Sequence, residues 1–181
     1  MTMNLPNKLT LFRVILIPFF VACILIPAIP FNNIIVCVIF CVASFTDFLD
    51  GYIARRDGLV TNFGKFMDPL ADKLLVGAAL ICLVETGQLP AWVVVVIISR
   101  EFIISGFRLI ASDNGVVIAA SYWGKFKTVS QMAMVIVLIL NIPGTFFGIL
   151  GSVLMWISVI LTIVSLVDYV IKNKDVLKDT K

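Results

Sequence analysis

The chain has 181 residues, of which 61% are hydrophobic, with a mean hydropathy of +1.10 and a formal net charge of +3. Soluble domains are only about half apolar, so this composition excludes a soluble globular protein and indicates an integral membrane protein, for which no nucleic-acid partner is expected. The length suits one membrane domain over residues 1–181. Because the chain has no histidine, histidine general bases and the usual zinc sites are excluded.

The first half of the chain opens with two predicted membrane helices. Residues 3–13 are expected to form an interfacial start to the first, which runs over 8–27. Residues 14–46 carry no charge, and this stretch is too long for one crossing of about 20 residues but suits two. The second helix is predicted over 33–55. The turn between them is marked by Pro27, Pro30, Asn32 and Asn33.

Four aspartates flank the next turn. Asp47 and Asp50 are three residues apart near the end of the second helix, and Asp68 and Asp72 are four apart near the start of a third, predicted over 64–85. These spacings place each pair on one helix face. Two carboxylates about 5 Å apart repel by roughly 3 kcal/mol at an effective dielectric near 20. Oxygen ligands without histidine or cysteine suit hard cations, so two Mg²⁺ or Mn²⁺ ions are predicted here. The alternative is a set of solvated helix ends at the membrane surface.

Three more helices are predicted over 91–112, 121–141 and 146–170. Arg100 and Glu101 fall near the middle of the first of these, where a charge is costly. Two interpretations stay open for them, namely substrate contact and an internal ion pair that holds the bundle.

Charge predicts the topology. Six helices place both termini on one side, and the three opposite turns carry no Lys or Arg. The positive-inside rule then puts both termini and the aspartate turn in the cytoplasm. The predicted fold is an all-α membrane protein with six transmembrane helices, a short N-terminal interfacial segment and a site on the cytoplasmic side. The basic residues on that side are Lys8, Arg13, Arg55, Arg56, Lys65, Arg108, Lys125, Lys127 and the four lysines of the tail.

The aspartate motif carries a family resemblance. From Asp47 it reads D-x-x-D-G-x-x-A-R, then eight residues, then G-x-x-x-D-x-x-x-D. This resembles the complete signature of the CDP-alcohol phosphotransferases. The resemblance implies transfer of a phosphoalcohol group from a CDP-linked donor to an acceptor hydroxyl, with release of CMP. It also implies that Asp47, Asp50 and Asp68 bind metal, and that Asp72 binds metal or acts as the general base.

The resemblance also implies a nucleotide site and a substrate pair. Gly51, Ala54 and Gly64 would be small so that the cytidine nucleotide can approach the backbone, with Arg55 beside it. The runs N-L-P-N-K-L-T and G-K-F-M-D-P-L-A-D-K resemble the members that use CDP-diacylglycerol as donor and glycerol 3-phosphate as acceptor. The expected reaction transfers the phosphatidyl group in phospholipid biosynthesis. A homodimer in a bacterial cytoplasmic membrane is likewise implied by the resemblance.

Basic residues outside the motif are candidates for the acceptor phosphate, for which Arg and Lys are the expected ligands. They are Arg100, Arg108, Lys125 and Lys127. Their alternative role is ordinary positive-inside charge, which is the favoured interpretation for Lys127. Two alternatives remain for function. The acceptor could be inositol phosphate, serine or phosphatidylglycerol, or the chain could be an ion-coupled transporter, whose site would lie near the midplane between interrupted helices.

Overall fold

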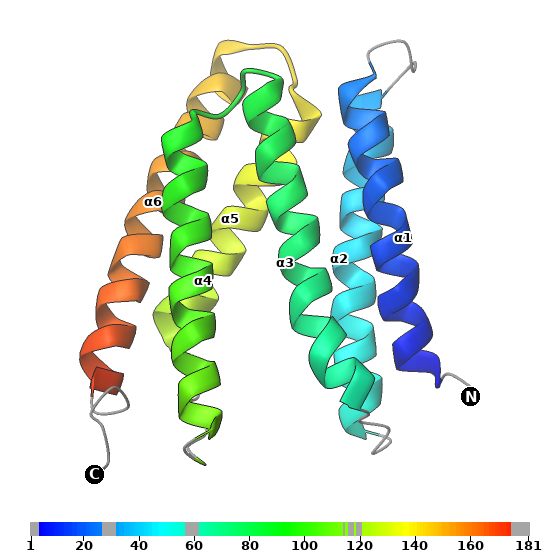
Figure 1. Ribbon diagram of the computed structural model, residues 1–181. Helices are drawn as coiled ribbons and strands as arrows, with labels where there is room; N and C mark the ends of the chain where they lie inside the picture. The colour runs from blue at the N-terminus through cyan, green and yellow to red at the C-terminus, as the bar shows by residue number, and fades with distance from the viewer. Residues whose placement is uncertain are drawn as a thin grey trace. The chain divides into compact units, whose positions relative to one another are not determined.

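The computed structural model describes residues 4–26, 32–56, 62–113, 115, 118 and 121–174 (Figure 1). Within these ranges, the side chains at 5, 6, 48, 50, 51, 54, 55, 62–66, 68, 69 and 113 lie outside the description. The described residues form six α-helices and turns, with no strand among them, which confirms the predicted all-α class. The chain divides into two compact units, Met1–Gln88 and Leu89–Lys181.

The first unit contains α1 (Leu5–Leu25), α2 (Asn32–Arg56) and α3 (Asn62–Glu85). Helix α1 packs against both of the others, and α2 also contacts α3. Within this unit, the start of α1, the end of α2 and the start of α3 share one end (Figure 1). The aspartate motif occupies the end of α2 and the start of α3, so the fold brings its two halves to one end of the unit.

Helix α1 presents a regular buried face to its neighbours. Its start is capped by Asn4, whose side chain accepts a hydrogen bond of 3.2 Å from the backbone N–H of Asn7. Buried side chains then recur every three or four residues, as on one face of a helix. In the apolar half of this face, the Phe20 ring meets Phe40 of α2 with centroids 6.0 Å apart. The members of the face are Asn7, Thr10, Arg13, Ile17 and Phe20.

The second unit contains α4 (Ala91–Asp113), α5 (Tyr122–Leu140) and α6 (Thr145–Asn173). Helix α6 packs against both α4 and α5. The side chain of Ser121 caps α5 by accepting a 3.1 Å hydrogen bond from the backbone N–H of Gly124. At its other end Asn141 adopts the left-handed conformation, with φ 43°, and closes the helix. Within this unit the end of α4, the start of α5 and the end of α6 share one end (Figure 1).

Three of the described helical stretches are long and apolar enough to cross a membrane, namely Asn7–Leu25, Tyr122–Leu140 and Thr145–Asn173. A shorter apolar stretch covers Asn32–Asp47. The remaining helices carry the aspartate motif or the charges of α4, which interrupt their apolar runs. The prediction of six spans with both termini cytoplasmic stays a prediction.

The predicted helix limits agree with the observed ones to within three residues at every end. Helix α1 is continuous from Leu5, so the part of the predicted interfacial segment 3–13 that lies within it forms its first turns. Helix α3 begins at Asn62, two residues before the predicted start at residue 64, and Pro69 is its eighth residue. The helix therefore runs past a residue that has no N–H to donate.

Candidate functional site

The four aspartates of the motif lie on two helices that meet at one end of the first unit. Asp47 and Asp50 are on α2, and Asp68 and Asp72 are on α3. Both stretches are helical, so spacings of three and four residues do place each pair on one helix face. The side chains of Asp50 and Asp68 lie outside the described residues. The same is true of Gly51, Ala54, Arg55 and Gly64, for which only the helical backbone is described.

Asp47 has a buried partner on the neighbouring helix. The Arg13 side chain of α1 is fully buried, and its Nη1 donates a hydrogen bond to Oδ1 of Asp47, whose side chain is 35% exposed. Burying a guanidinium is costly unless a carboxylate compensates it. The sequence interpretation counted Arg13 only as positive-inside charge and missed this contact. The available signal was its spacing from Thr10 and Ile17, which places it on the buried face of α1.

Asp72 is exposed, in contrast to its neighbours Ala71 and Leu75, which are buried. Helix α3 therefore directs Asp72 away from the packed face of the first unit. Among the residues whose side chains are described, no group of three or more metal-ligating side chains occurs. The predicted four-carboxylate metal site includes two side chains outside that set, so it stays a prediction. An all-oxygen donor set fits Mg²⁺ or Mn²⁺ by its chemistry.

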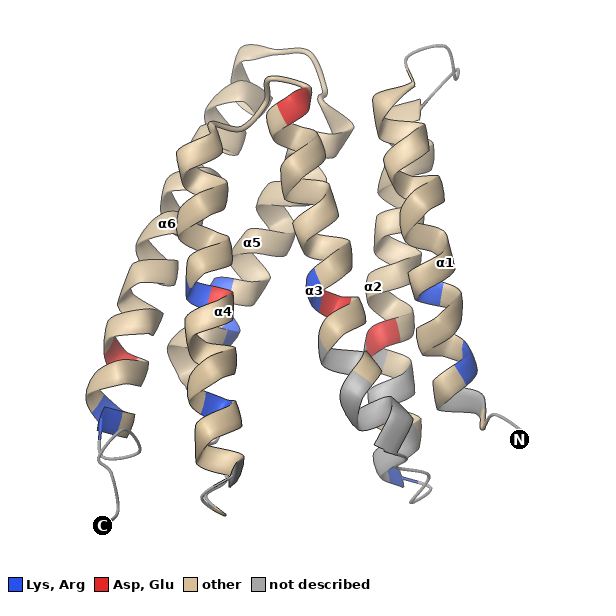
Figure 2. Ribbon diagram, viewed as in Figure 1, with Lys and Arg blue, Asp and Glu red and all other residues tan. Residues whose placement is uncertain are grey.

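The second unit holds an ion cluster made by Arg100, Glu101 and Lys127, in which the two cations are buried. Figure 2 shows basic and acidic positions on the helices of this unit. One carboxylate oxygen, Oε1 of Glu101, accepts from Nη1 of Arg100 at 3.0 Å and from Nζ of Lys127 at 2.5 Å. Arg100 also donates from Nε to Oγ of Ser165 on α6, at 3.1 Å. Arg100 is 8% exposed and Lys127 only 3%. The sequence favoured ordinary positive-inside charge for Lys127, and the structure adds that α5 turns this side chain into the packed interior of the unit.

The other two basic candidates are exposed. The Arg108 guanidinium lies 6.0 Å from the ring centroid of Tyr169, and Nζ of Lys125 lies 5.4 Å from that of Tyr122. These contacts to aromatic faces leave the cationic groups at the surface of the unit. The four predicted acceptor residues thus form two classes, an exposed pair (Arg108 and Lys125) and a buried pair (Arg100 and Lys127).

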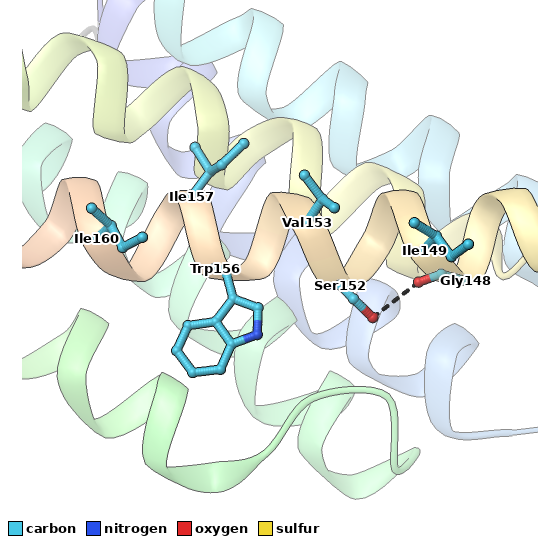
Figure 3. Close-up of a pocket in the computed structure, with 7 residues that line it drawn as sticks. All are labelled: Gly148, Ile149, Ser152, Val153, Trp156, Ile157 and Ile160. Atoms are coloured by element: carbon cyan, nitrogen blue, oxygen red, sulfur yellow. Dashed lines mark hydrogen bonds between the residues drawn. The ribbon is translucent and has the colours of Figure 1, made fainter.

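An apolar pocket also lies in the second unit, along one face of α6 between Gly148 and Ile160 (Figure 3). Trp156 lines it, and the ring of this residue packs at 5.7 Å from that of Trp92 on α4. The Ser152 hydroxyl donates to the backbone oxygen of Gly148 at 3.0 Å. None of the residues predicted to carry chemistry lines this pocket.

Comparison with known proteins adds a full-length relationship. The chain matches the CDP-alcohol phosphatidyltransferase family over residues 3–164. It is 46% identical to a CDP-diacylglycerol–glycerol-3-phosphate 3-phosphatidyltransferase of Bacillus subtilis, over 97% of each chain. It is 42% identical to a protein of the same name from Haemophilus influenzae, over 99% of this chain and 98% of the relative. It is also 38% identical to a probable phosphatidylglycerophosphate synthase of Mycobacterium tuberculosis, over 92% of this chain and 80% of the relative.

Proposed function

The chain belongs to the CDP-alcohol phosphatidyltransferase family, and we propose that it transfers the phosphatidyl group of CDP-diacylglycerol to glycerol 3-phosphate. The products are phosphatidylglycerophosphate and CMP, so the chain is a membrane transferase of phospholipid biosynthesis. The observation that carries this proposal is the similarity, over nearly the whole chain, to relatives named for this reaction. The complete aspartate motif and the all-helical, apolar fold agree with it.

In this proposal, Asp47, Asp50, Asp68 and Asp72 hold two Mg²⁺ or Mn²⁺ ions. The donor set consists of carboxylate oxygens alone, which is the chemistry these cations prefer. When bound, the ions supply positive charge that offsets the donor pyrophosphate and the leaving CMP. Arg13 anchors Asp47 from α1 through its contact with Oδ1, which supports a fixed orientation for that carboxylate.

Residues of the chain itself are proposed to take up the proton and to bind the nucleotide. Asp72, exposed on α3, accepts the proton of the acceptor hydroxyl. The acceptor oxygen attacks the lipid-side phosphorus, the bond from that phosphorus to the bridging oxygen breaks, and CMP leaves with the bonding electrons. Gly51, Ala54 and Gly64 allow the cytidine nucleotide to approach the backbone, and Arg55 lies beside it.

The acceptor phosphate is assigned to the basic residues of the second unit. Arg108 and Lys125 are exposed, so they contact the phosphate directly and form charge-assisted hydrogen bonds with it. Arg100 and Lys127 are buried, so they do not contact the phosphate directly but add positive charge in the interior of the same unit. Substituting Arg108 or Lys125 with alanine is therefore expected to raise the KM for glycerol 3-phosphate.

The proposed setting is a membrane with six crossings and both termini in the cytoplasm. The distribution of Lys and Arg supports this orientation. The aspartates then lie at the cytoplasmic edge of the bilayer, where the tails of CDP-diacylglycerol stay in lipid while a water-soluble acceptor reaches the donor pyrophosphate. The proposed active form is a homodimer, as the family resemblance implies.

The test is CMP release by the purified protein in detergent, with CDP-diacylglycerol and Mg²⁺. Glycerol 3-phosphate, inositol phosphate and serine are supplied in turn, and EDTA is added in a separate reaction. Release that needs both glycerol 3-phosphate and the metal is expected. Release with a different alcohol would overturn the acceptor, and release that survives EDTA would overturn the metal site. No release with any alcohol would overturn the transferase proposal.

A further inference from the structure

We propose that Glu101 is a positioning residue for the acceptor site, because its carboxylate holds Arg100 and Lys127 together between α4 and α5. This inference rests on the proposed function, since it assumes that the cations of the second unit receive the acceptor phosphate. Glu101 is not part of the aspartate motif, and the sequence left it open between substrate contact and a structural ion pair.

The geometry of the cluster makes Glu101 its centre. A single oxygen, Oε1, accepts from Nη1 of Arg100 on α4 at 3.0 Å and from Nζ of Lys127 on α5 at 2.5 Å. The two cations would repel each other at such close range if this shared acceptor were removed. Both cations are more than nine-tenths buried, so water cannot replace the carboxylate at low cost. Glu101 is therefore a shared counter-ion that lowers the repulsion between Arg100 and Lys127.

The surroundings of Arg100 restrict its movement further. Its Nε donates to Ser165 of α6 at 3.1 Å, and a Cβ added at Gly124 of α5 would come within 3.2 Å of its Nη2. Arg100 is thus enclosed by side chains or backbone of all three helices of the unit. Helices α4 and α5 each pack on α6. The hydrogen bond from Lys127 to Glu101 adds a direct side-chain bridge between α4 and α5.

This bridge fixes the helices that carry the exposed cations. Lys125 precedes Lys127 by two residues on α5, and Arg108 follows Arg100 by eight on α4, which is about 12 Å along the helix. A change in the α4 to α5 contact therefore shifts Lys125 relative to Arg108. The cluster also keeps one net positive charge, from two cations and one carboxylate, which favours an anion nearby. Loss of Glu101 should impair acceptor binding by misplacing these cations, while donor binding on the first unit stays intact.

The experiment compares Glu101→Gln with Glu85→Gln, a matched control in which the exposed glutamate at the end of α3 loses the same charge. Both are measured as full-length protein in detergent, by CMP release with each substrate varied in turn. Glu101→Gln is expected to raise the KM for glycerol 3-phosphate about tenfold or more, the scale of a truncated buried charge pair. In Glu101→Gln the KM for CDP-diacylglycerol should stay within about twofold of the wild-type value. In Glu85→Gln the KM values for both substrates should stay within about twofold, because an exposed carboxylate contributes little.

Two further measurements separate positioning from a general loss of structure. Inorganic phosphate and glycerol 3-phosphate should raise the thermal unfolding midpoint of the wild type, by ligand linkage, and should raise it less in Glu101→Gln. The effect of Glu101→Gln on the acceptor KM should also shrink in a Lys127→Met background, because Glu101 acts partly through Lys127.

The outcomes are distinct. An unchanged acceptor KM in Glu101→Gln, or an equal rise in the KM of both substrates, would overturn the positioning role. A wild-type protein that neither phosphate compound stabilises would also overturn it, because no anion site would then exist to organise. The wild-type CMP assay alone decides the proposed function, so a wild type that uses glycerol 3-phosphate alongside an unaffected Glu101→Gln would refute only this inference.

Discussion

Replacing Gly124 by alanine tests whether Arg100 is held as tightly as its contacts indicate. The new Cβ would lie 3.2 Å from Nη2 of Arg100 and 3.5 Å from Oγ of Ser121. The second distance is an ordinary contact, but the first requires Arg100 to move by a few tenths of an ångström. Arg100 cannot move without straining its hydrogen bonds to Ser165 and Glu101.

Two opposing effects set the change in unfolding free energy that Gly124→Ala causes. Alanine is more favourable than glycine by up to about 1 kcal/mol in a helix interior. The gain is smaller in the first turn, where Gly124 lies. Overpacking a closely packed site costs typically about 1–3 kcal/mol. The net expectation is a destabilisation of about 1 kcal/mol. The matched control is Gly106→Ala on α4, where a Cβ meets nothing within 4 Å, so only the helix-propensity gain of about 1 kcal/mol applies.

The assay is thermal unfolding in detergent, followed by circular dichroism. The two variants should differ by about 2 kcal/mol, which corresponds to roughly 4–8 °C in the unfolding midpoint of a protein of this size. Gly106→Ala should unfold above the wild type and Gly124→Ala below it. If Gly124→Ala unfolds at the same temperature as Gly106→Ala, Arg100 moves freely and the cluster is not rigid.

Three further outcomes are expected. Lys127→Met should lower the unfolding free energy by about 2 kcal/mol, less than the loss of an entire buried pair because Arg100 still contacts Glu101; a change below 0.5 kcal/mol, the order of an exposed pair, would contradict the buried contact. Arg13→Met should destabilise the chain by about 1–2 kcal/mol, because Asp47 loses its hydrogen bond from Arg13 but is itself 35% exposed, and an unchanged melting curve would argue against that contact. Asp72→Asn should keep the wild-type melting temperature yet abolish CMP release; a normal rate would remove this residue from the role of general base.

The helices could be predicted because this chain separates apolar runs from turn residues clearly. Residues 14–46 lack charge, and the prolines and asparagines near their middle mark a turn. The observed ends of α2 and α4 fall within one residue of the predicted ends. The start of α3 at Asn62 lies two residues from the predicted start at residue 64, although Pro69 inside this helix has no N–H to donate.

The aspartate motif could be recognised from spacing, but its support from α1 could not. Local periodicity relates residues on one helix, whereas the contact from Arg13 to Asp47 joins residues 34 apart in the chain. A charged residue ahead of an apolar run ordinarily indicates the membrane surface. The competing signal was that Arg13 continues the spacing of Thr10, Ile17 and Phe20 on one helical face.

The division of the basic residues follows from helix geometry in the same way. Lys125 and Lys127 are two residues apart, so they point about 200° apart around α5 and cannot both face its packed side. The sequence does indicate which one is buried, because Lys127 starts the series that continues through Gln131, Met134 and Val135, all of them buried. A cation on such a face requires a carboxylate within reach, and Glu101 on α4 provides it. Lys127 is therefore held by the packed face of α5 and by Glu101, whereas Lys125 lies on the exposed face of the same helix.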